Sequence, residues 1–244
     1  MMEIKLQKNI KIETSMCDNL SKLSIPSLFT IFMDLACEHA PMLGLGSDTL
    51  MPKGLFWVAA KTKVKIHRKP EMLTEATACT WPEAPGRIRT NRYYTLSDQN
   101  GVLAEGKTEW AIIDIKTGRP VKLSEVYPEN MVHLEEKVCD LPFARIKDDF
   151  ENCNSLGTYT VRSTDIDIGQ HMNNVAYIRA LFGAFTCKEL ENLSFTDIDI
   201  SFKNQCYEGE TLSLLKKKAE NGFEIGFIKQ DGTIAATVSL ESNI

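Results

Sequence analysis

Apolar and polar residues follow the same plan twice along this chain. In each copy a long apolar helical stretch is followed by segments that alternate, or are rich in β-branched and aromatic residues, as strands are. The helices are predicted at residues 24–40 and 174–190. The strands of the first copy are predicted at 3–13, 55–67, 75–81, 88–97 and 102–115, and those of the second at 157–162, 198–207, 211–219, 223–229 and 233–241.

Glycine turns indicate how these strands connect. The turns at 98–101, 221–222 and 231–232 each end in glycine, and sequences of this kind join antiparallel strands in hairpins. Each copy is therefore predicted to be one long helix followed by a four-strand antiparallel meander. This is an α+β arrangement in which a curved antiparallel sheet wraps the helix. Residues 123–154 are charged and irregular, which predicts a linker between the copies.

Composition excludes several classes of protein. The net charge of −5 argues against nucleic acid as a partner, because phosphate binding needs a basic surface. No run of 18 apolar residues occurs, so no membrane span is expected, and the charged N-terminal segment resembles no signal peptide. Seven cysteines without a Cys-x-x-Cys pair suggest neither a disulfide framework nor a zinc site, and a reducing cytoplasm fits best.

The segment 164–177 concentrates groups that can do chemistry. Asp165 and Asp167 share one face of an extended chain, His171 follows, and Asn173 and Asn174 open the second predicted helix. Carboxylate, imidazole and amide groups thus gather at a helix N-terminus, where backbone N–H groups favour developing negative charge. Asp165 is expected to be a capping or turn residue.

The same segment resembles the Asp-x-Asn-x-His-x-Asn-Asn motif of the acyl-acyl carrier protein thioesterases. Residues 54–58, 110–120 and 202–206 resemble further segments of that family in the same order, so the resemblance covers nearly the whole chain. It implies two tandem hotdog domains: an N-terminal domain at 1–125 with the acyl-chain pocket, a linker at 126–154, and a C-terminal domain at 155–244 with the catalytic signature. It also implies hydrolysis of fatty acyl-carrier protein in the cytoplasm, without metal or organic cofactor.

The resemblance assigns catalytic roles to four residues. Asp167 matches the catalytic acid and His171 the catalytic histidine, whereas Gln205 stands where the family has Glu. Cys206 is a nucleophile only if its thiolate is stabilised. The alternatives from general residue behaviour are a helix cap for Asp167, a surface residue for His171 and a core residue for Cys206. In a regular strand, Gln205 and Cys206 would face opposite sides.

Substrate-binding residues follow from the same resemblance. Gly169 stands where the family has a catalytic Asn, so only its backbone N–H is left to contact the reacting group. Asn173 and Gln170 are the candidates to supply the amide instead. Met33, Ala36 and Trp57 are candidates for the acyl pocket, with ordinary core packing as the alternative.

An acidic carrier protein as partner implies a basic docking face. The candidates are three clusters, at Lys61, Lys63 and Lys65, at Arg87 and Arg89, and at Lys216–Lys218. Either a monomer or a homodimer is compatible with two fused hotdogs.

Two other functions stay open from the sequence. Hotdog proteins acting on coenzyme A esters share a similar segment, so an acyl-coenzyme A thioesterase is one alternative. A non-catalytic acyl-binding protein is the other, because Gly169 and Gln205 remove an amide and a carboxylate from the expected catalytic set.

Overall fold

The chain divides into two compact units. The computed structural model describes residues 4–129 and 131–243. Its N-terminal unit comprises residues 1–141 and its C-terminal unit residues 142–244. The division falls inside the segment that the sequence predicts as a linker.

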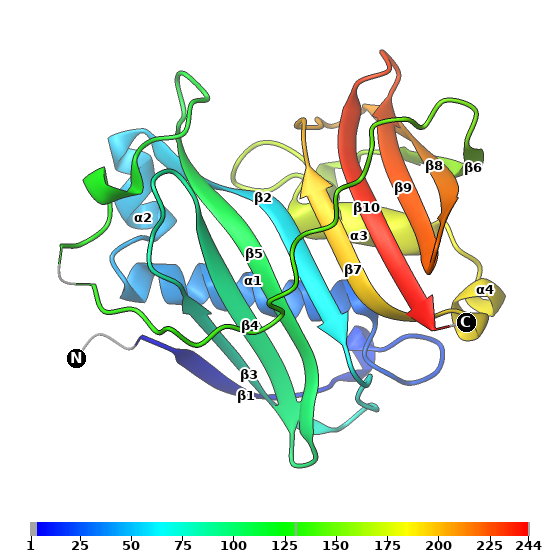
Figure 1. Ribbon diagram of the computed structural model, residues 1–244, viewed down its shortest axis with the longest axis horizontal. Coiled ribbons are helices and arrows are strands. Elements are labelled where there is room, and N and C mark those ends of the chain that lie inside the picture. Colours follow the sequence, from blue (N-terminus) through cyan, green and yellow to red (C-terminus); the bar gives the residue numbers. More distant parts are fainter. Residues whose placement is uncertain (1–3, 130, 244) are drawn as a thin grey trace. The chain divides into compact units, whose positions relative to one another are not determined.

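The N-terminal unit is one long helix on a five-stranded antiparallel sheet (Figure 1). Its helices are α1 (Ile25–Met42), α2 (Ser47–Leu50) and the 3-10 turns η1 (Thr14–Met16), η2 (Met51–Lys53) and η3 (Leu123–Glu125). Its strands are β1 (Leu6–Lys11), β2 (Leu55–Ile66), β3 (Glu75–Pro82), β4 (Thr90–Asp98) and β5 (Gly101–Asp114). These five strands lie within a few residues of the predicted positions.

Helix α1 begins and ends where its sequence dictates. The Ser24 hydroxyl caps the helix by accepting a hydrogen bond from the Ser27 N–H at 3.2 Å, and a proline in the first turn suits a position without a helical N–H partner. Gly44, with a φ of 71°, follows its last turn. The face that includes Phe32 and Ala36 is buried, and Figure 1 shows α1 crossing one face of the sheet.

The strand order corrects the predicted meander. In the N-terminal unit the order is β1-β3-β4-β5-β2, so the strand that follows the helix pairs with the last strand and not with the next one. Only β3, β4 and β5 form a meander. Hairpin turns predict pairing between strands that are neighbours in sequence. No short turn joins β2 to β3, however, and the connection at 67–74 leads from β2, which pairs with β5, to β3, which lies on the far side of β4.

The C-terminal unit repeats this topology. Its strands are β6 (Asn154–Thr160), β7 (Ser194–Phe202), β8 (Thr211–Ala219), β9 (Gly222–Lys229) and β10 (Ile234–Asn243), in the order β7-β10-β9-β8-β6. Its helices are the 3-10 turn η4 (Ser163–Asp165), α3 (Asn174–Gly183) and α4 (Cys187–Asn192). The strand after the helix, β7, again pairs with the last strand, β10.

Two predicted boundaries in this unit are wrong. The single helix predicted at 174–190 is two helices, because Thr186 starts α4 with a capping box in which its hydroxyl and the Glu189 carboxylate bond each other's backbone N–H. The strand predicted at 198–207 is β7, which ends at Phe202. Gln205 and Cys206 therefore lie in a loop, and strand alternation does not decide which way they face.

The segment after η3 packs on the N-terminal unit. Leu134 and Val138 cover Trp81 and Tyr93, and the Trp81 indole N–H donates to the Glu136 carbonyl at 2.8 Å. Irregular backbone is compatible with such packing because its polar groups find partners in the covered face. The predicted linker is thus partly a cover for one face of the first sheet.

Candidate active site

The candidate catalytic groups lie on one tight loop before α3. Ile166 and Met172 form a β-bridge across its base. Inside the bridge, the Asp167 N–H donates to the His171 carbonyl at 3.2 Å, and the Gln170 N–H donates to the Asp167 carbonyl at 2.9 Å. These bonds hold the two predicted catalytic residues opposite each other across the loop.

Asp165 anchors both ends of this loop. Its Oδ2 accepts hydrogen bonds from the Tyr159 hydroxyl at 2.7 Å and the Arg162 N–H at 2.9 Å, and its carbonyl accepts from both the backbone and side-chain N–H groups of Asn173 at 2.8 Å. The Arg179 guanidinium lies 3.7 Å from Oδ1. Burial and the bond to Asp165 raise the pKa of Tyr159 to about 12. Asp165 therefore caps and fixes the loop, as the sequence suggests.

Replacing Asp165 with alanine is expected to lower the free energy of unfolding by about 2 to 4 kcal/mol, because the Tyr159 hydroxyl and the Arg162 N–H lose their acceptor. Urea unfolding measures the change. Asp140→Ala, at an exposed acid, is the control and is expected to stay within about 0.5 kcal/mol of wild type. Equal values for the two variants would contradict the anchoring role of Asp165.

Asp167 is half-buried and already binds the loop backbone. Its Oδ1 accepts a hydrogen bond from the Gly169 N–H at 2.8 Å, two residues on. The same contact consumes the backbone N–H that Gly169 would otherwise offer to a substrate. The amide expected from the family motif at this position is therefore missing both as a side chain and as a free backbone donor.

His171 is half-buried, and its ring contacts the loop backbone. Nδ1 lies 3.3 Å from the Met172 carbonyl oxygen. Because a carbonyl only accepts, Nδ1 carries the proton in this contact and Nε2 holds the lone pair. An imidazole in this tautomer can act as a base through Nε2.

Asn173 is the N-cap of α3. Its Oδ1 accepts from the Ala176 N–H at 2.8 Å, and its Nδ2 donates to the Asp165 carbonyl at 2.8 Å. Both ends of the side-chain amide are thus engaged within the protein. This geometry favours a positioning role for Asn173 over direct contact with a substrate.

The loop after β7 brings Gln205 and Cys206 beside the site in different ways. The Cys206 carbonyl accepts a hydrogen bond from the Met172 N–H at 2.8 Å, which ties the two loops together. Gln205 is exposed, and its Oε1 accepts from the Tyr207 hydroxyl at 2.9 Å. Its amide therefore remains accessible to solvent and to a ligand.

Cys206 is wholly buried, and burial raises the pKa of its thiol. The Tyr177 hydroxyl and Lys229 lower this pKa, but burial outweighs them, and Sγ donates weakly to the Asn204 carbonyl at 4.0 Å. A thiol held neutral in this way is a poor nucleophile. These contacts favour a packing role for Cys206.

Cys206→Ala is expected to keep kcat within about tenfold of wild type, since loss of a true nucleophile costs on the order of a million-fold. Fatty acid release from acyl-carrier protein measures this. In a thiol-labelling experiment on the folded wild type, the exposed Cys37 and Cys187 react first and Cys206 does not. A drop of a thousandfold or more in a folded variant would restore Cys206 as nucleophile.

The three residues predicted for the acyl pocket lie in the N-terminal unit. Ala36 is buried and Met33 half-buried on α1. Trp57 on β2 donates its indole N–H to the Leu45 carbonyl at 2.9 Å and packs edge-on against Trp110. None of the three is among the residues that line a small cavity of this unit.

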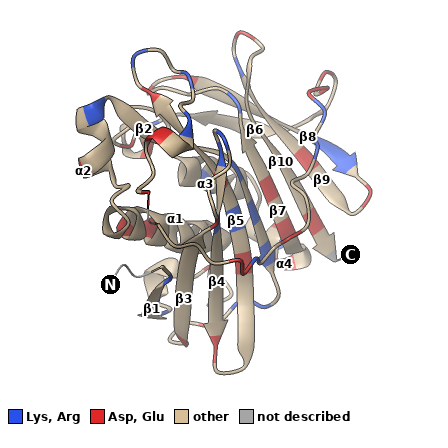
Figure 2. Cartoon of the chain, turned by 60° about the vertical axis from the view of Figure 1, so that its left-hand side comes forward, with Lys and Arg blue, Asp and Glu red and all other residues tan. Residues whose placement is uncertain are grey.

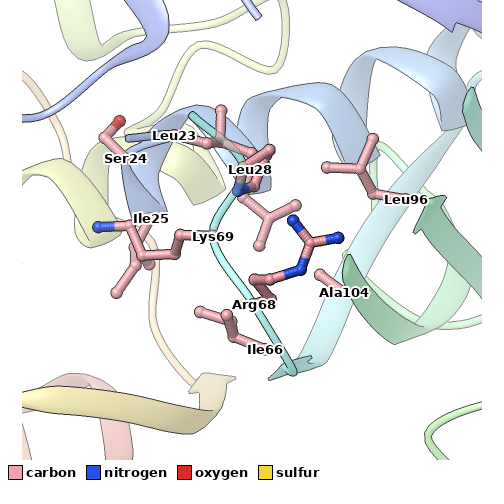
Figure 3. Close-up of a pocket in the computed structure, with 10 residues that line it drawn as sticks. Leu23, Ser24, Ile25, Leu28, Ile66, Arg68, Lys69, Leu96 and Ala104 are labelled. Atoms are coloured by element: carbon pink, nitrogen blue, oxygen red, sulfur yellow. The ribbon is translucent and has the colours of Figure 1, made fainter. Parts of the chain in front are cut away.

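That cavity lies near the start of α1 (Figure 3). Leu28, Leu96 and Ala104 are among its lining residues, with Arg68 and Lys69. Its free volume is about 10 Å³, room for no more than a single water. An acyl chain can occupy this cavity only if side chains move.

The predicted basic faces are partly neutralised. Lys63 is buried directly opposite Lys107 of β5. Arg89 pairs with Glu109, and Lys217 pairs with Asp149 and Glu224. Figure 2 shows acidic residues on strands beside basic ones.

Two further properties concern membranes and metals. No single described helix has the length and apolar composition of a membrane span, although α1 and the α2–η2 segment, bent by 51° at their break, pass that test as a pair. In the described part of the chain, no three His, Cys, Asp or Glu side chains gather in a way that could hold a metal ion.

Comparison with known proteins decides the family. Residues 3–131 match the model of the acyl-ACP thioesterase N-terminal domain, and residues 150–241 match that of the C-terminal domain. The chain belongs to the acyl-ACP thioesterase family. Within this family, the palmitoyl-acyl carrier protein thioesterase of Cuphea hookeriana is 25% identical over 216 residues, which cover 82% of this chain and 51% of the relative. The chain thus spans about half the length of the curated relatives it matches.

Solved structures show the acyl-ACP thioesterase fold. An acyl-ACP thioesterase from Bacteroides thetaiotaomicron superposes with a TM-score of 0.82 at 20% identity, covering 98% of both chains. The 12:0-ACP thioesterase from Umbellularia californica also gives a TM-score of 0.82, at 16% identity, covering 100% of this chain and 98% of that one. The fold class is therefore α+β, dominated by antiparallel sheet.

Some residues of the site are missed by sequence reasoning. Tyr159, Arg179 and Tyr177 contact Asp165 or Cys206, yet each lies in an ordinary strand or helix pattern. The spacing of Arg179 offers a weak signal, because a basic residue six positions into α3 can reach back toward its N-terminus.

Proposed function

We propose that this protein is a thiolester hydrolase that releases fatty acid from acyl-carrier protein in the cytoplasm. The observation that carries the proposal is the pairing of Asp167 and His171 across one loop at the start of α3, in a chain of the acyl-ACP thioesterase family. Each unit is a hotdog domain, the first for the acyl chain and the second for catalysis. Met33, Ala36 and Trp57 line the acyl site after side chains rearrange.

His171 is the general base of the proposed mechanism. Its Nε2 removes a proton from a water that attacks the thioester carbonyl carbon, and Asp167 orients that water through the carboxylate oxygen not bound to Gly169. The first backbone N–H groups of α3, apart from that of Ala176, which Asn173 caps, stabilise the oxyanion. When the C–S bond breaks, the leaving thiol takes its proton from His171.

Gln205 assists without acting as a base. An amide cannot take up a proton at neutral pH, but it can hold the water or the carbonyl oxygen. Its exposure beside the Met172 loop is compatible with that role. Cys206 and Asn173 hold the site in position through the contacts already described.

Kinetics with two thioesters of one chain length test the substrate class. We expect a higher kcat/KM for the acyl-carrier protein than for the acyl-coenzyme A ester. A clear preference for the coenzyme A ester would replace the proposed substrate by the alternative one.

A non-catalytic acyl-binding protein is the second candidate. The observation that favours it is that the Gly169 N–H and both ends of the Asn173 amide are occupied within the protein. Binding of acyl-carrier protein without turnover, over hours at high protein concentration, would identify this function.

A further inference from the structure

A buried guanidinium lies inside the N-terminal unit. Arg92 on β4 is 8% exposed. Its Nη1 lies 2.9 Å from Nδ1 of His39 on α1 and 3.3 Å from the Thr80 hydroxyl on β3. Because a guanidinium only donates, the imidazole nitrogen accepts in this contact. Arg92 thus points into the space between the sheet and α1.

No carboxylate balances this charge. Among the described residues, the ion pairs of the N-terminal unit involve other cations, and none includes Arg92. Burial lowers the pKa of the guanidinium, and the groups that oppose this are Tyr94, Tyr127 and Cys37. A buried cation is costly unless an anion or several acceptors compensate it. Because its partners are all neutral, the positive charge of Arg92 has no compensating negative charge.

Two more donors on the same face lack acceptors. The Tyr94 hydroxyl and the Trp110 indole N–H are buried without a hydrogen-bond partner. Burial raises the pKa of Tyr94, whereas the nearby Arg92 charge and the side chains of Thr108 and Trp110 lower it. Strand register places Arg92 opposite Thr108, and Tyr94 two residues along β4. An excess of buried donors calls for an acceptor that the chain itself does not supply.

We propose that this cluster binds the oxygen atoms of a carboxylate, so that the N-terminal unit selects an acyl chain carrying a second carboxylate far from its thioester. The choice of a carboxylate follows from the chemistry, because its two oxygens accept together from a guanidinium. The substrate assignment rests on the proposed thioesterase function. The site itself does not, since a free dicarboxylic acid carries the same group.

The neighbourhood of the cluster fits a ligand that is not wholly hydrocarbon. The cavity beside Leu96 and Ala104 lies on the same face, about 13 Å along β4 from Arg92 at strand rise. Between them, Phe32 stacks on Tyr94 with ring centroids 5.0 Å apart. A Cβ on Gly106, opposite Tyr94, would stand 3.0 Å from the Phe32 ring. A ligand that reaches Arg92 therefore displaces this stack, and the carboxylate contact compensates for that displacement.

Binding of free acids tests the site without catalysis. Tryptophan fluorescence or calorimetry compares a dicarboxylic acid with the monocarboxylic acid of equal carbon number on the full chain. We expect the dicarboxylic acid to bind about 10- to 100-fold more tightly, as a charge-assisted contact predicts. Arg92→Met abolishes the difference, Arg92→Lys keeps part of it, and Arg119→Met, at an exposed arginine, leaves it unchanged.

Tyr94→Phe keeps the proposal testable if Arg92→Met fails to fold. The hydroxyl it removes has no partner, so the free protein melts at the same temperature or higher. The dicarboxylic acid then binds severalfold more weakly, while the monocarboxylic acid is unaffected. Equal affinity of the two acids for wild type, or a preference that survives both Arg92→Met and Tyr94→Phe, would overturn the proposal.

Hydrolysis kinetics distinguish a carboxylate carried by the substrate from one carried by a free effector. With ω-carboxyacyl-carrier protein and the plain acyl-carrier protein of equal length, a higher kcat/KM for the former that Arg92→Met removes identifies the acyl chain as the source of the carboxylate. A preference confined to free acids supports the site and identifies a free effector. If no thioester is hydrolysed while the free-acid preference holds, the thioesterase proposal fails and the carboxylate site stands.

Discussion

Replacing His171 with alanine is expected to lower kcat for acyl-carrier protein hydrolysis by about 100- to 10,000-fold, the range that general acid–base catalysis contributes. His171 is the group on the loop whose Nε2 is left with a lone pair by the Nδ1 contact to the Met172 carbonyl. Its backbone carbonyl, which the Asp167 N–H bonds, is retained in the variant. The loop should therefore keep its shape, and the loss should fall on kcat more than on KM.

The control is another histidine outside the site. His67 is exposed and lies 3.4 Å from Glu105 in the N-terminal unit. His67→Ala is expected to leave kcat within about twofold of wild type, as surface substitutions usually do. If the two histidine variants hydrolyse acyl-carrier protein at the same rate as wild type, His171 is not the base.

Replacing Gly169 with asparagine is expected to raise kcat by up to about 100-fold, because a missing oxyanion or orienting donor costs about 100- to 1000-fold. The substitution supplies a side-chain amide while the backbone N–H keeps its bond to Asp167. The glycines that take a positive φ do not include Gly169, so a side chain is compatible with the backbone there. Steady-state rates on one acyl-carrier protein measure the gain.

Gly169→Ala separates the amide from the added bulk. It places a Cβ at the same position without a donor, and we expect its rate to equal or fall below that of wild type. A folded Gly169→Asn variant that is no faster than Gly169→Ala would mean that the site has been rearranged around another donor. Gln205, with its exposed amide, would then be the next residue to replace.

Local signals in the sequence predict most of the fold. Ser24 caps α1, glycine closes the β4–β5, β8–β9 and β9–β10 turns, and alternation places most strands within a few residues. Strand pairing is not local. That β2 pairs with β5, and β7 with β10, depends on how the sheet packs against its helix, which no turn residue reports.

The sequence predicts where the candidate site lies along the chain, but it does not predict the hydrogen bonds of the loop. The segment motif locates Asp167 and His171, and it correctly makes Asn173 the start of a helix. The motif cannot show that the Gly169 N–H donates a hydrogen bond to Asp167, since that bond depends on the turn geometry of the folded loop. The sequence also gives no signal that Arg92 is buried, because its burial results from packing between α1 and the sheet.

Release of free fatty acid from a panel of acyl-carrier proteins by the purified protein tests the central claim most directly. The proposed mechanism predicts release of fatty acid and an equal amount of carrier thiol from at least one chain length, with the rate lost in His171→Ala. No release from any member of the panel, or a release rate unchanged in His171→Ala, would contradict it.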